Sequence, residues 1–265
     1  KPIGLSSSQL VSKIKFLFRA KKAGHTGTLD PMATGLLPIC LGEATKFSSY
    51  LLNADKTYEA IIKLGYKSST GDVEGEITKQ KVDIMPSLAE IKKLLHEFSG
   101  TIEQRPPMFS ALKYQGKPLY SYARDGIDVP RPKRKVMIHT IELLKYQGNK
   151  LKLKIKCSKG TYVRTLAEDI GDQLNIGGYL IELRRINIGN LSIDDAVNIE
   201  QIEKIEDKER VKLLLPTEEL LSEYENIVLN SNEEIAIKDG KIIEQGGKRP
   251  GLYKLYGSNN VFIGL

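Results

Sequence analysis

The sequence predicts an α+β fold, with a larger domain over residues 1–224 that contains a mixed, mainly antiparallel sheet, and a small β domain over residues 225–265. Helix-spaced segments and hairpin-like strand pairs follow one another without the regular strand–helix alternation of a doubly wound sheet. No fixed-period repeat is present. Beyond residue 226 the composition changes, because six of the last 39 residues are glycine and short apolar runs alternate with turns.

The N-terminal part is predicted to hold two helices and one buried strand around a broken loop. Serines at positions 6–8 offer a helix N-cap, and apolar residues then recur at helical spacing until about Arg19. Glycines and prolines between Gly24 and Pro38 exclude long regular elements there. The apolar run Leu36–Leu41 predicts a strand, and Glu43–Leu52 predicts the second helix.

The middle of the chain predicts the sheet and a helix that covers it. Tyr58–Leu64 alternates apolar and polar residues, as a half-buried strand does. The capping box Ser87–Glu90 opens a helix that Gly100 closes. Val136–Tyr146 and Leu151–Cys157 predict a β-hairpin.

The C-terminal third begins with a helix and ends in short strands. Leu166, Ile170 and Leu174 recur at helical spacing. The segment Leu213–Asn226 is predicted to be a short helical connection, and Ile227–Leu265 a small all-β unit.

Composition excludes several classes of protein. The 265 residues include only two cysteines, too few for a disulfide framework, so we expect a reducing, cytoplasmic compartment. No stretch approaches the roughly 20 apolar residues of a membrane helix, and no signal peptide is evident. Because the chain opens on Lys1 and a Pro-Gly turn, we expect a strand to precede it in the natural protein.

Positive charge is concentrated in one block. Arg105–Arg164 holds fifteen Lys/Arg and three acidic residues with tyrosines interleaved, whereas acid dominates from Ile193 to Asn226. Such a block suits a polyanion whose bases are available for stacking. One side of the predicted hairpin is a lysine ladder, a candidate contact to an RNA backbone: Lys152, Lys154 and Lys156. A solvated face is the alternative interpretation.

Two segments carry the candidate chemistry. Cys40 and Cys157 lie in apolar runs without ligand spacing, no P-loop or dinucleotide motif is present, and a metal site is not predicted. In the loop Gly24–Gly35, His25 and Asp30 are the groups able to titrate or attack, although a surface histidine and an Asx-turn would also explain them.

The second candidate segment is Lys159–Arg164, at the start of the helix that follows the lysine ladder. An arginine in the first turn of a helix is disfavoured by the helix dipole, which indicates an anion nearby. A phosphate contact, a surface ion pair and a role beside Asp30 all remain open from these residues alone.

A longer series of motifs is similar to the bacterial tRNA pseudouridine synthase B family. Gly24–Pro38 with Gly42–Lys46 resembles the family's catalytic motif over its full length. The other matching segments are Lys1–Ser7, Asp55–Tyr58, Met108–Lys113, Lys159–Arg164 and Leu183–Arg185. The resemblance implies the pseudouridine synthase catalytic fold followed by an RNA-binding domain of the PUA type, which is usually longer than residues 227–265.

The resemblance implies isomerisation of the uridine at position 55, in the T loop of tRNA, to pseudouridine without a cofactor or metal. Asp30 matches the catalytic carboxylate, and two routes stay open: attack on the ribose or base, or deprotonation of the ribose to a glycal. Arg164 matches the pocket arginine, which would pair with Asp30 and resist the rise in carboxyl pKa that burial causes.

The remaining matches imply contacts to the substrate. Tyr58 and Tyr162 would stack on or bound the uracil, with Tyr58 assisting proton loss at C5, and Leu183 would form an apolar wall. His25 would fill the place that the flipped uridine vacates. The basic block would hold the tRNA T stem-loop by its A-form shape.

Two other functions fit the same residues. One is a non-catalytic tRNA-binding or tRNA-folding module in which Asp30 is structural, and the other is a synthase that works inside a guide-RNA complex. The bacterial character of the motifs favours an enzyme that needs no obligate protein partner and acts as a monomer.

Overall fold

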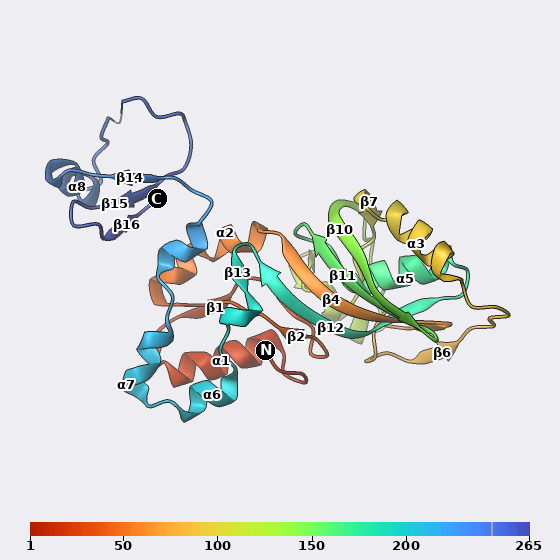
Figure 1. Cartoon of the computed structure of the whole chain (residues 1–265). Coiled ribbons are helices and arrows are strands. Elements are labelled where there is room, and N and C mark those ends of the chain that lie inside the picture. Colours follow the sequence, from red (N-terminus) through yellow and green to blue (C-terminus); the bar gives the residue numbers. More distant parts are fainter. Residues whose placement is uncertain (245) are drawn as a thin grey trace.

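A long twisted sheet forms the main body of the computed structural model, which describes residues 1–244 and 246–265 (Figure 1). The strand order is β13-β12-β4-β11-β10-β7, with β2 beside β12. Among the strand pairs of this sheet within the described residues, β2–β12 is parallel and the others are antiparallel, which confirms the predicted mixed, mainly antiparallel arrangement. The strands are β2 (Thr34–Gly35), β4 (Lys56–Leu64), β7 (Gly100–Gln104), β10 (Arg134–Gln147), β11 (Lys150–Cys157), β12 (Gly178–Ile188) and β13 (Leu191–Ser192).

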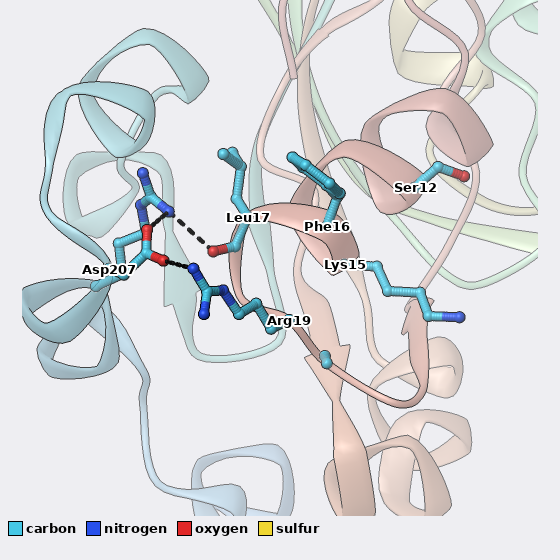
Figure 2. Close-up of a pocket in the computed structure, with 8 residues that line it drawn as sticks. Ser12, Lys15, Phe16, Leu17, Arg19 and Asp207 are labelled. Carbon is cyan, nitrogen blue, oxygen red and sulfur yellow. Dashed lines mark hydrogen bonds and ion pairs between the residues drawn. The ribbon is translucent and has the colours of Figure 1, made fainter.

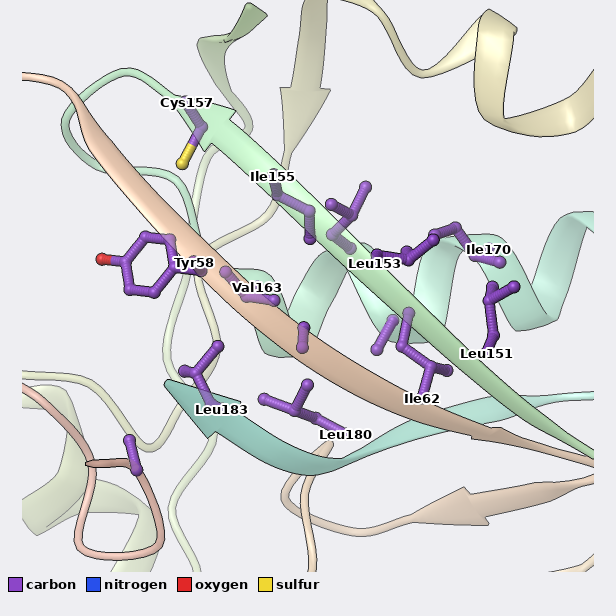
Figure 3. Close-up of a cluster of buried hydrophobic side chains, with 14 of the residues drawn as sticks. Tyr58, Ile62, Leu151, Leu153, Ile155, Cys157, Val163, Ile170, Leu180 and Leu183 are labelled. Atoms are coloured by element: carbon purple, nitrogen blue, oxygen red, sulfur yellow. The ribbon is translucent and has the colours of Figure 1, made fainter. Parts of the chain in front are cut away.

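One face of the sheet carries the core. Residues of β4 alternate between buried and half-buried. The buried side chains at every second position from Tyr58 to Leu64 belong to the same hydrophobic cluster as apolar side chains of β11 and of the covering helices (Figure 3). Helices α3 (Leu88–Glu97) and α5 (Val163–Gln173) cover this face with their apolar stripes. The predicted capping box at Ser87 opens α3, although α3 ends at Glu97 and Gly100 already belongs to β7.

Helix α5 lies unusually close to the sheet at one point. A Cβ on Gly171 would stand 2.0 Å from the backbone nitrogen of Gly178, the first residue of β12. Only glycine allows this approach. It fixes the direction of α5, whose first turn carries Arg164.

The N-terminal segment packs against the end of the sheet. It contains α1 (Ser7–Leu17), β1 (Ala23–His25), β3 (Ile39–Leu41), η1 (Gly42–Phe47) and α2 (Ser48–Asn53). Ser6 caps α1 in a complete capping box, as its sequence predicts. The strand predicted for residues 36–41 is confined to β3, because Pro38 has no N–H and the Leu36 N–H donates to the carbonyl of Arg185 at 2.8 Å.

A buried arginine ties the chain's later helices to α1. In α7 (Asp207–Arg210), which follows α6 (Ile199–Lys204), Nη1 of Arg210 donates to the Leu17 carbonyl at 2.9 Å and to Asp207 at 2.7 Å. Figure 2 shows these bonds beside the exposed ring of Phe16. The carbonyl of Leu17, the last residue of α1, thereby gains a cationic partner.

The C-terminal unit differs from the predicted all-β piece. It contains β14 (Asn226–Val228), α8 (Ser231–Lys238), β15 (Lys254–Tyr256) and β16 (Phe262–Gly264). The helix forms because Asn230 and Glu233 make a complete capping box. The apolar run at 241–243 is not a strand, and Ile242 is 97% exposed.

The unit joins the main body through aromatic contacts. The short helix η4 (Thr217–Leu221) occupies the predicted connection. Phe262 meets Phe47 edge-on at 5.9 Å between ring centroids, and Tyr224 meets Tyr50 at 5.6 Å. The remaining short elements are β5 (Tyr66–Ser68), β6 (Ile77–Lys79), β8 (Lys113–Tyr114), β9 (Lys117–Pro118), α4 (Leu119–Arg124), η2 (Ile193–Asp195) and η3 (Val211–Leu213).

Candidate active site

Asp30 and Arg164 face each other across the loop that follows β1 and the first turn of α5. Nε of Arg164 lies 2.9 Å from Oδ2 of Asp30, and its Nη2 donates to Oδ1 at 3.2 Å. The arginine side chain is 4% exposed and the aspartate side chain 28% exposed. Two nitrogens of the buried guanidinium therefore bind the two carboxylate oxygens, and part of the carboxylate stays accessible to solvent.

A second aspartate lies near the same nitrogen of the guanidinium. Oδ2 of Asp72 lies 3.5 Å from Nε of Arg164, and its Oδ1 accepts hydrogen bonds from the Thr70 hydroxyl at 2.6 Å and the Glu74 N–H at 3.0 Å. Arg164 also donates to the carbonyls of Thr70 and Phe109. Asp72 is not predicted from the sequence as a site residue, because its Ser-, Thr- and Gly-rich surroundings indicate an ordinary turn and carry no sign of burial.

The pKa of Asp30 is raised above its usual value. Burial is the largest cause, and the negative charge of Asp72 acts in the same direction. The charge of Arg164 and its hydrogen bond lower the pKa without cancelling the effect of burial. The expected ion pair is thus present, and it offsets the desolvation of the carboxylate only in part.

Tyr58 and Leu183 lie on neighbouring strands of the sheet, and the charge of Asp30 acts on the Tyr58 phenol. Both are buried, on β4 and β12, and both belong to the main core cluster. Figure 3 shows the Tyr58 hydroxyl directed away from the neighbouring aliphatic side chains. Burial raises the pKa of the phenol, whereas the nearby charge of Arg185 and a hydrogen bond from that residue lower it.

His25 ends β1 on the loop side. Its Nδ1 accepts a hydrogen bond from the Gly27 N–H at 3.3 Å. Burial lowers the pKa of the imidazole, and the positive charge of Arg185 lowers it further. A neutral ring that accepts at Nδ1 is suited to packing against bases.

Tyr162 stands at the N-cap of α5, two residues before Arg164. The buried amide of Gln104 holds its backbone from both sides, accepting from the Tyr162 N–H at 3.0 Å and donating to its carbonyl at 3.3 Å. Burial raises the pKa of the Tyr162 phenol. Gln104 was not predicted from the sequence, since an isolated glutamine in a strand carries no recognisable signal.

The lysine ladder lies on the opposite face of the sheet. Ile155 pairs with Tyr58 across β11 and β4, whereas Lys154 pairs with Glu59, so the two sets of side chains point in opposite directions. Lys152 is moreover bound to Glu59 at 2.9 Å. The sheet separates the ladder from Asp30, and a contact between the ladder and RNA stays a prediction.

Two basic side chains bind carbonyls of the Asp30 loop. Nζ of Lys1 donates to the carbonyls of Pro2, Pro31 and Ala33 at 2.8, 3.2 and 2.6 Å. Arg185 donates to Gly27 and Leu36. The sequence shows both residues within matching motifs, but nothing in it shows which atoms they bind.

Other site types receive no support from the residues described. Cys40 and Cys157 are free and buried, as predicted. Over residues 1–244 and 246–265, no three His, Cys, Asp or Glu side chains are grouped so that they could hold a metal ion. Within the same residues, every helix is too short or too polar to cross a bilayer.

Comparison with known families assigns the chain to one of them. Residues 15–163 match "TruB family pseudouridylate synthase (N terminal domain)", which covers more than half of the chain. The chain belongs to the TruB family. Residues 164–222 match "tRNA pseudouridylate synthase B C-terminal domain". The border between the two TruB matches falls inside α5, so it does not separate two structural units.

Curated TruB relatives are similar over the whole of this chain and most of their own length. A tRNA pseudouridine synthase B of Nitrosomonas europaea is 50% identical over 274 residues, covering 100% of this chain and 89% of the relative. That of Methylobacillus flagellatus is 45% identical over 266 residues, with 100% and 88% covered.

The fold is also that of solved structures. A chain in the crystal structure of a Cbf5-Nop10-Gar1 complex superposes with a TM-score of 0.74 at 26% identity, covering 99% of this TruB chain and 74% of the other. A chain in an H/ACA RNP structure gives 0.73 at 24% identity. These likenesses confirm the predicted catalytic fold class.

Proposed function

We propose that this chain converts the uridine at position 55, in the T loop of tRNA, to pseudouridine, with Asp30 as the catalytic carboxylate. Its TruB membership and its likeness to named tRNA pseudouridine synthases support the isomerisation of a tRNA uridine. The observation that carries the role of Asp30 is its geometry. A carboxylate that is 28% exposed is held through two donors by a buried guanidinium, and its charge acts on the Tyr58 phenol.

The reaction breaks the N-glycosidic bond and rejoins the uracil through C5. Asp30 must be ionised either to attack the substrate or to take a proton from the ribose. Its raised pKa makes the carboxylate a stronger base than a free aspartate, while Arg164 favours the ionised form by its charge and hydrogen bond. Tyr58, whose hydroxyl leaves the core, assists the loss of the C5 proton.

The target base has to leave the folded T loop to reach Asp30. His25 lies on the same loop, and its neutral ring replaces the flipped base by stacking. Leu183 and Tyr162 bound the flipped uracil. The basic block Arg105–Arg164 binds phosphates of the T stem by shape.

The protein works as a monomer in the cytoplasm, without an obligate protein partner. Its net charge of +7 and basic block suit direct binding of RNA. Residues 1–224 form the catalytic domain in this proposal. Residues 225–265 form a small PUA-like unit that adds contact area for tRNA, and the contact of its Phe262 with Phe47 holds it beside η1.

The decisive experiment compares the parent protein with Asp30→Asn. Both are incubated with an unmodified tRNA transcript, and pseudouridine is mapped and counted. We expect one pseudouridine at position 55 with the parent and none with the variant, at tRNA affinities that agree within about threefold because phosphate contacts dominate binding.

Three other outcomes would contradict the proposal in distinct ways. Turnover by pure Asp30→Asn protein would remove Asp30 from the chemistry. Modification at another position would change the substrate site. Tight tRNA binding with no modification by the parent would favour the tRNA-folding module instead.

A further inference from the structure

Arg185 is the most deeply buried cation of the site. It is 1% exposed and heads the large side chains that are fully buried. Its Nε donates to the Leu36 carbonyl at 2.8 Å and its Nη2 to the Gly27 carbonyl at 3.1 Å. Within the described residues no carboxylate lies within ion-pair distance of it. A charge that is desolvated without a counter-ion is costly for folding, which indicates a role beyond stability.

The two carbonyls stand on either side of Asp30 in the chain. Gly27 precedes Asp30 by three residues and Leu36 follows it by six. One guanidinium therefore joins the entry and the exit of the loop that carries the carboxylate. Its planar fork provides two donors in a fixed geometry, which an ammonium group cannot reproduce.

The main chain of Arg185 also holds the exit of the loop. Strand β2 pairs with β12 through Gly35 and Arg185, and the Leu36 N–H donates to the Arg185 carbonyl. Gly35 has φ +106°, and a Cβ there would lie 2.2 Å from the Arg185 carbonyl oxygen. Backbone contacts with β12 thus fix the exit of the Asp30 loop at Gly35 and Leu36. The side chain of Arg185 connects this exit to the entry of the loop at Gly27.

Tyr58 is the third group beside Arg185. The two residues are cross-strand partners between β12 and β4, so their side chains lie next to each other on the same face of the sheet. Burial raises the pKa of the Tyr58 phenol, and the charge of Arg185 opposes that rise. The side chain of Arg185 thereby borders both the Asp30 loop and Tyr58.

We infer that Arg185 is a positioning residue for the isomerisation, which holds the Asp30 loop and the Tyr58 hydroxyl in one fixed arrangement. This inference rests on the proposed function. The substrate need not touch Arg185, because the residue is 1% exposed and its Nε and Nη2 donate to the two loop carbonyls. Its loss should then lower the rate of the chemical step more than the affinity for tRNA.

The test compares the parent with Arg185→Lys and Arg185→Met. Arg184→Met is the matched control, because it removes the same charge from the adjacent, exposed position. Asp30→Asn serves as the inactive reference. Single-turnover rates at saturating enzyme, tRNA dissociation constants and melting temperatures are measured on each full-length protein with a tRNA transcript.

We expect Arg185→Met to lower the saturated rate at least about a hundredfold and Arg185→Lys about tenfold, with tRNA affinity within about threefold of the parent. Arg184→Met should keep the parent's saturated rate. A merely structural arginine would lower the melting temperature and leave the rate of the folded protein unchanged.

Folded Arg185→Met or Arg185→Lys protein with a saturated rate within about threefold of the parent would overturn the inference. If Arg185→Met does not fold, Arg185→Lys decides alone, because it keeps the buried charge. Activity of the parent and inactivity of Asp30→Asn test the proposed function separately. The Asp30 variant therefore reports a failure of the proposed function, and the Arg185 variants report a failure of the positioning role.

Discussion

Replacing Arg164 by methionine separates the charge of this residue from its volume. In the parent protein the guanidinium contacts both Asp30 and Asp72, and it also donates to the carbonyls of Thr70 and Phe109. Methionine fills much of the space but offers no donor. The variant leaves two carboxylates facing each other and two carbonyls without this partner.

The size of the effect follows from burial. Breaking a buried ion pair by removing one partner typically costs about 3 to 5 kcal/mol. The lower value applies here, because Asp30 is 28% exposed and relieves part of the cost by binding a proton. If about 3 kcal/mol is also lost from the transition state, the saturated rate falls about a hundredfold, since 1.36 kcal/mol corresponds to tenfold.

The pH dependence gives the sign of the electrostatic effect. Burial already raises the pKa of Asp30, and Arg164 is the main group that lowers it. Without Arg164 the carboxyl ionises at still higher pH, so the residual activity of Arg164→Met should rise toward higher pH than that of the parent. Arg164→Lys should recover part of the rate, because it restores the charge without the two-donor geometry.

These predictions are tested by single-turnover rates at saturating enzyme, measured across pH for the parent and both variants. A saturated rate within threefold of the parent, combined with weaker tRNA binding, would make Arg164 a phosphate contact. An unshifted pH profile in a slow variant would show that Arg164 orients Asp30 without setting its ionisation.

Two further predictions concern groups away from the Asp30 carboxylate. Burial, aided by the charges of neighbouring Asp169 and Asp172, raises the pKa of Glu168 to about 7. Because this folded-state pKa lies above the unfolded value of 4.5, stability falls as pH rises from about 4.5 to about 7. Glu168→Gln should therefore gain roughly 1 to 2 kcal/mol at pH 8, allowing for its partial exposure, and nothing at pH 4. Thermal melts at both pH values check this against the exposed control Glu97→Gln, and equal melting temperatures at pH 8 would refute it. Changing the lysine ladder, residues 152, 154 and 156, to Gln should reduce the slope of log binding constant against log salt concentration by about two, because Lys152 is already paired with Glu59. The saturated rate should stay unchanged. A slope equal to that of the parent would place the RNA elsewhere.

Local chemistry explains which elements could be predicted from the sequence. The capping boxes at Ser6 and Ser87 form between residues three apart, so their sequence signals are independent of the rest of the fold. Alternation from Tyr58 to Leu64 likewise reports burial on one face of β4. The same kind of local signal lies at Asn230 and Glu233 and opens α8, within a glycine-rich segment whose short apolar runs favour strands.

The candidate site could be predicted from sequence only where a motif carries it. Asp30, His25 and Arg164 lie in motifs long enough to be recognised, and Arg164 stands out further because the first turn of a helix disfavours a cation. Asp72, Gln104 and Arg185 each act through a partner that is distant in the chain. Their pairing depends on how strands and loops meet, which no local pattern records.

The sequence by itself determined the α+β class, the order of most elements and the segments that hold the chemistry, because hydrophobic period, capping and turn residues act over a few neighbouring positions. Only the tertiary structure decided which face of the sheet each residue occupies. Strand register places Tyr58 and Arg185 on the face of Asp30 and places Lys154 on the other, since a shift of one residue in pairing would exchange the faces. The close approach of Gly35 to Arg185 then fixes the Asp30 loop against β12, where Arg164 of α5 meets the carboxylate.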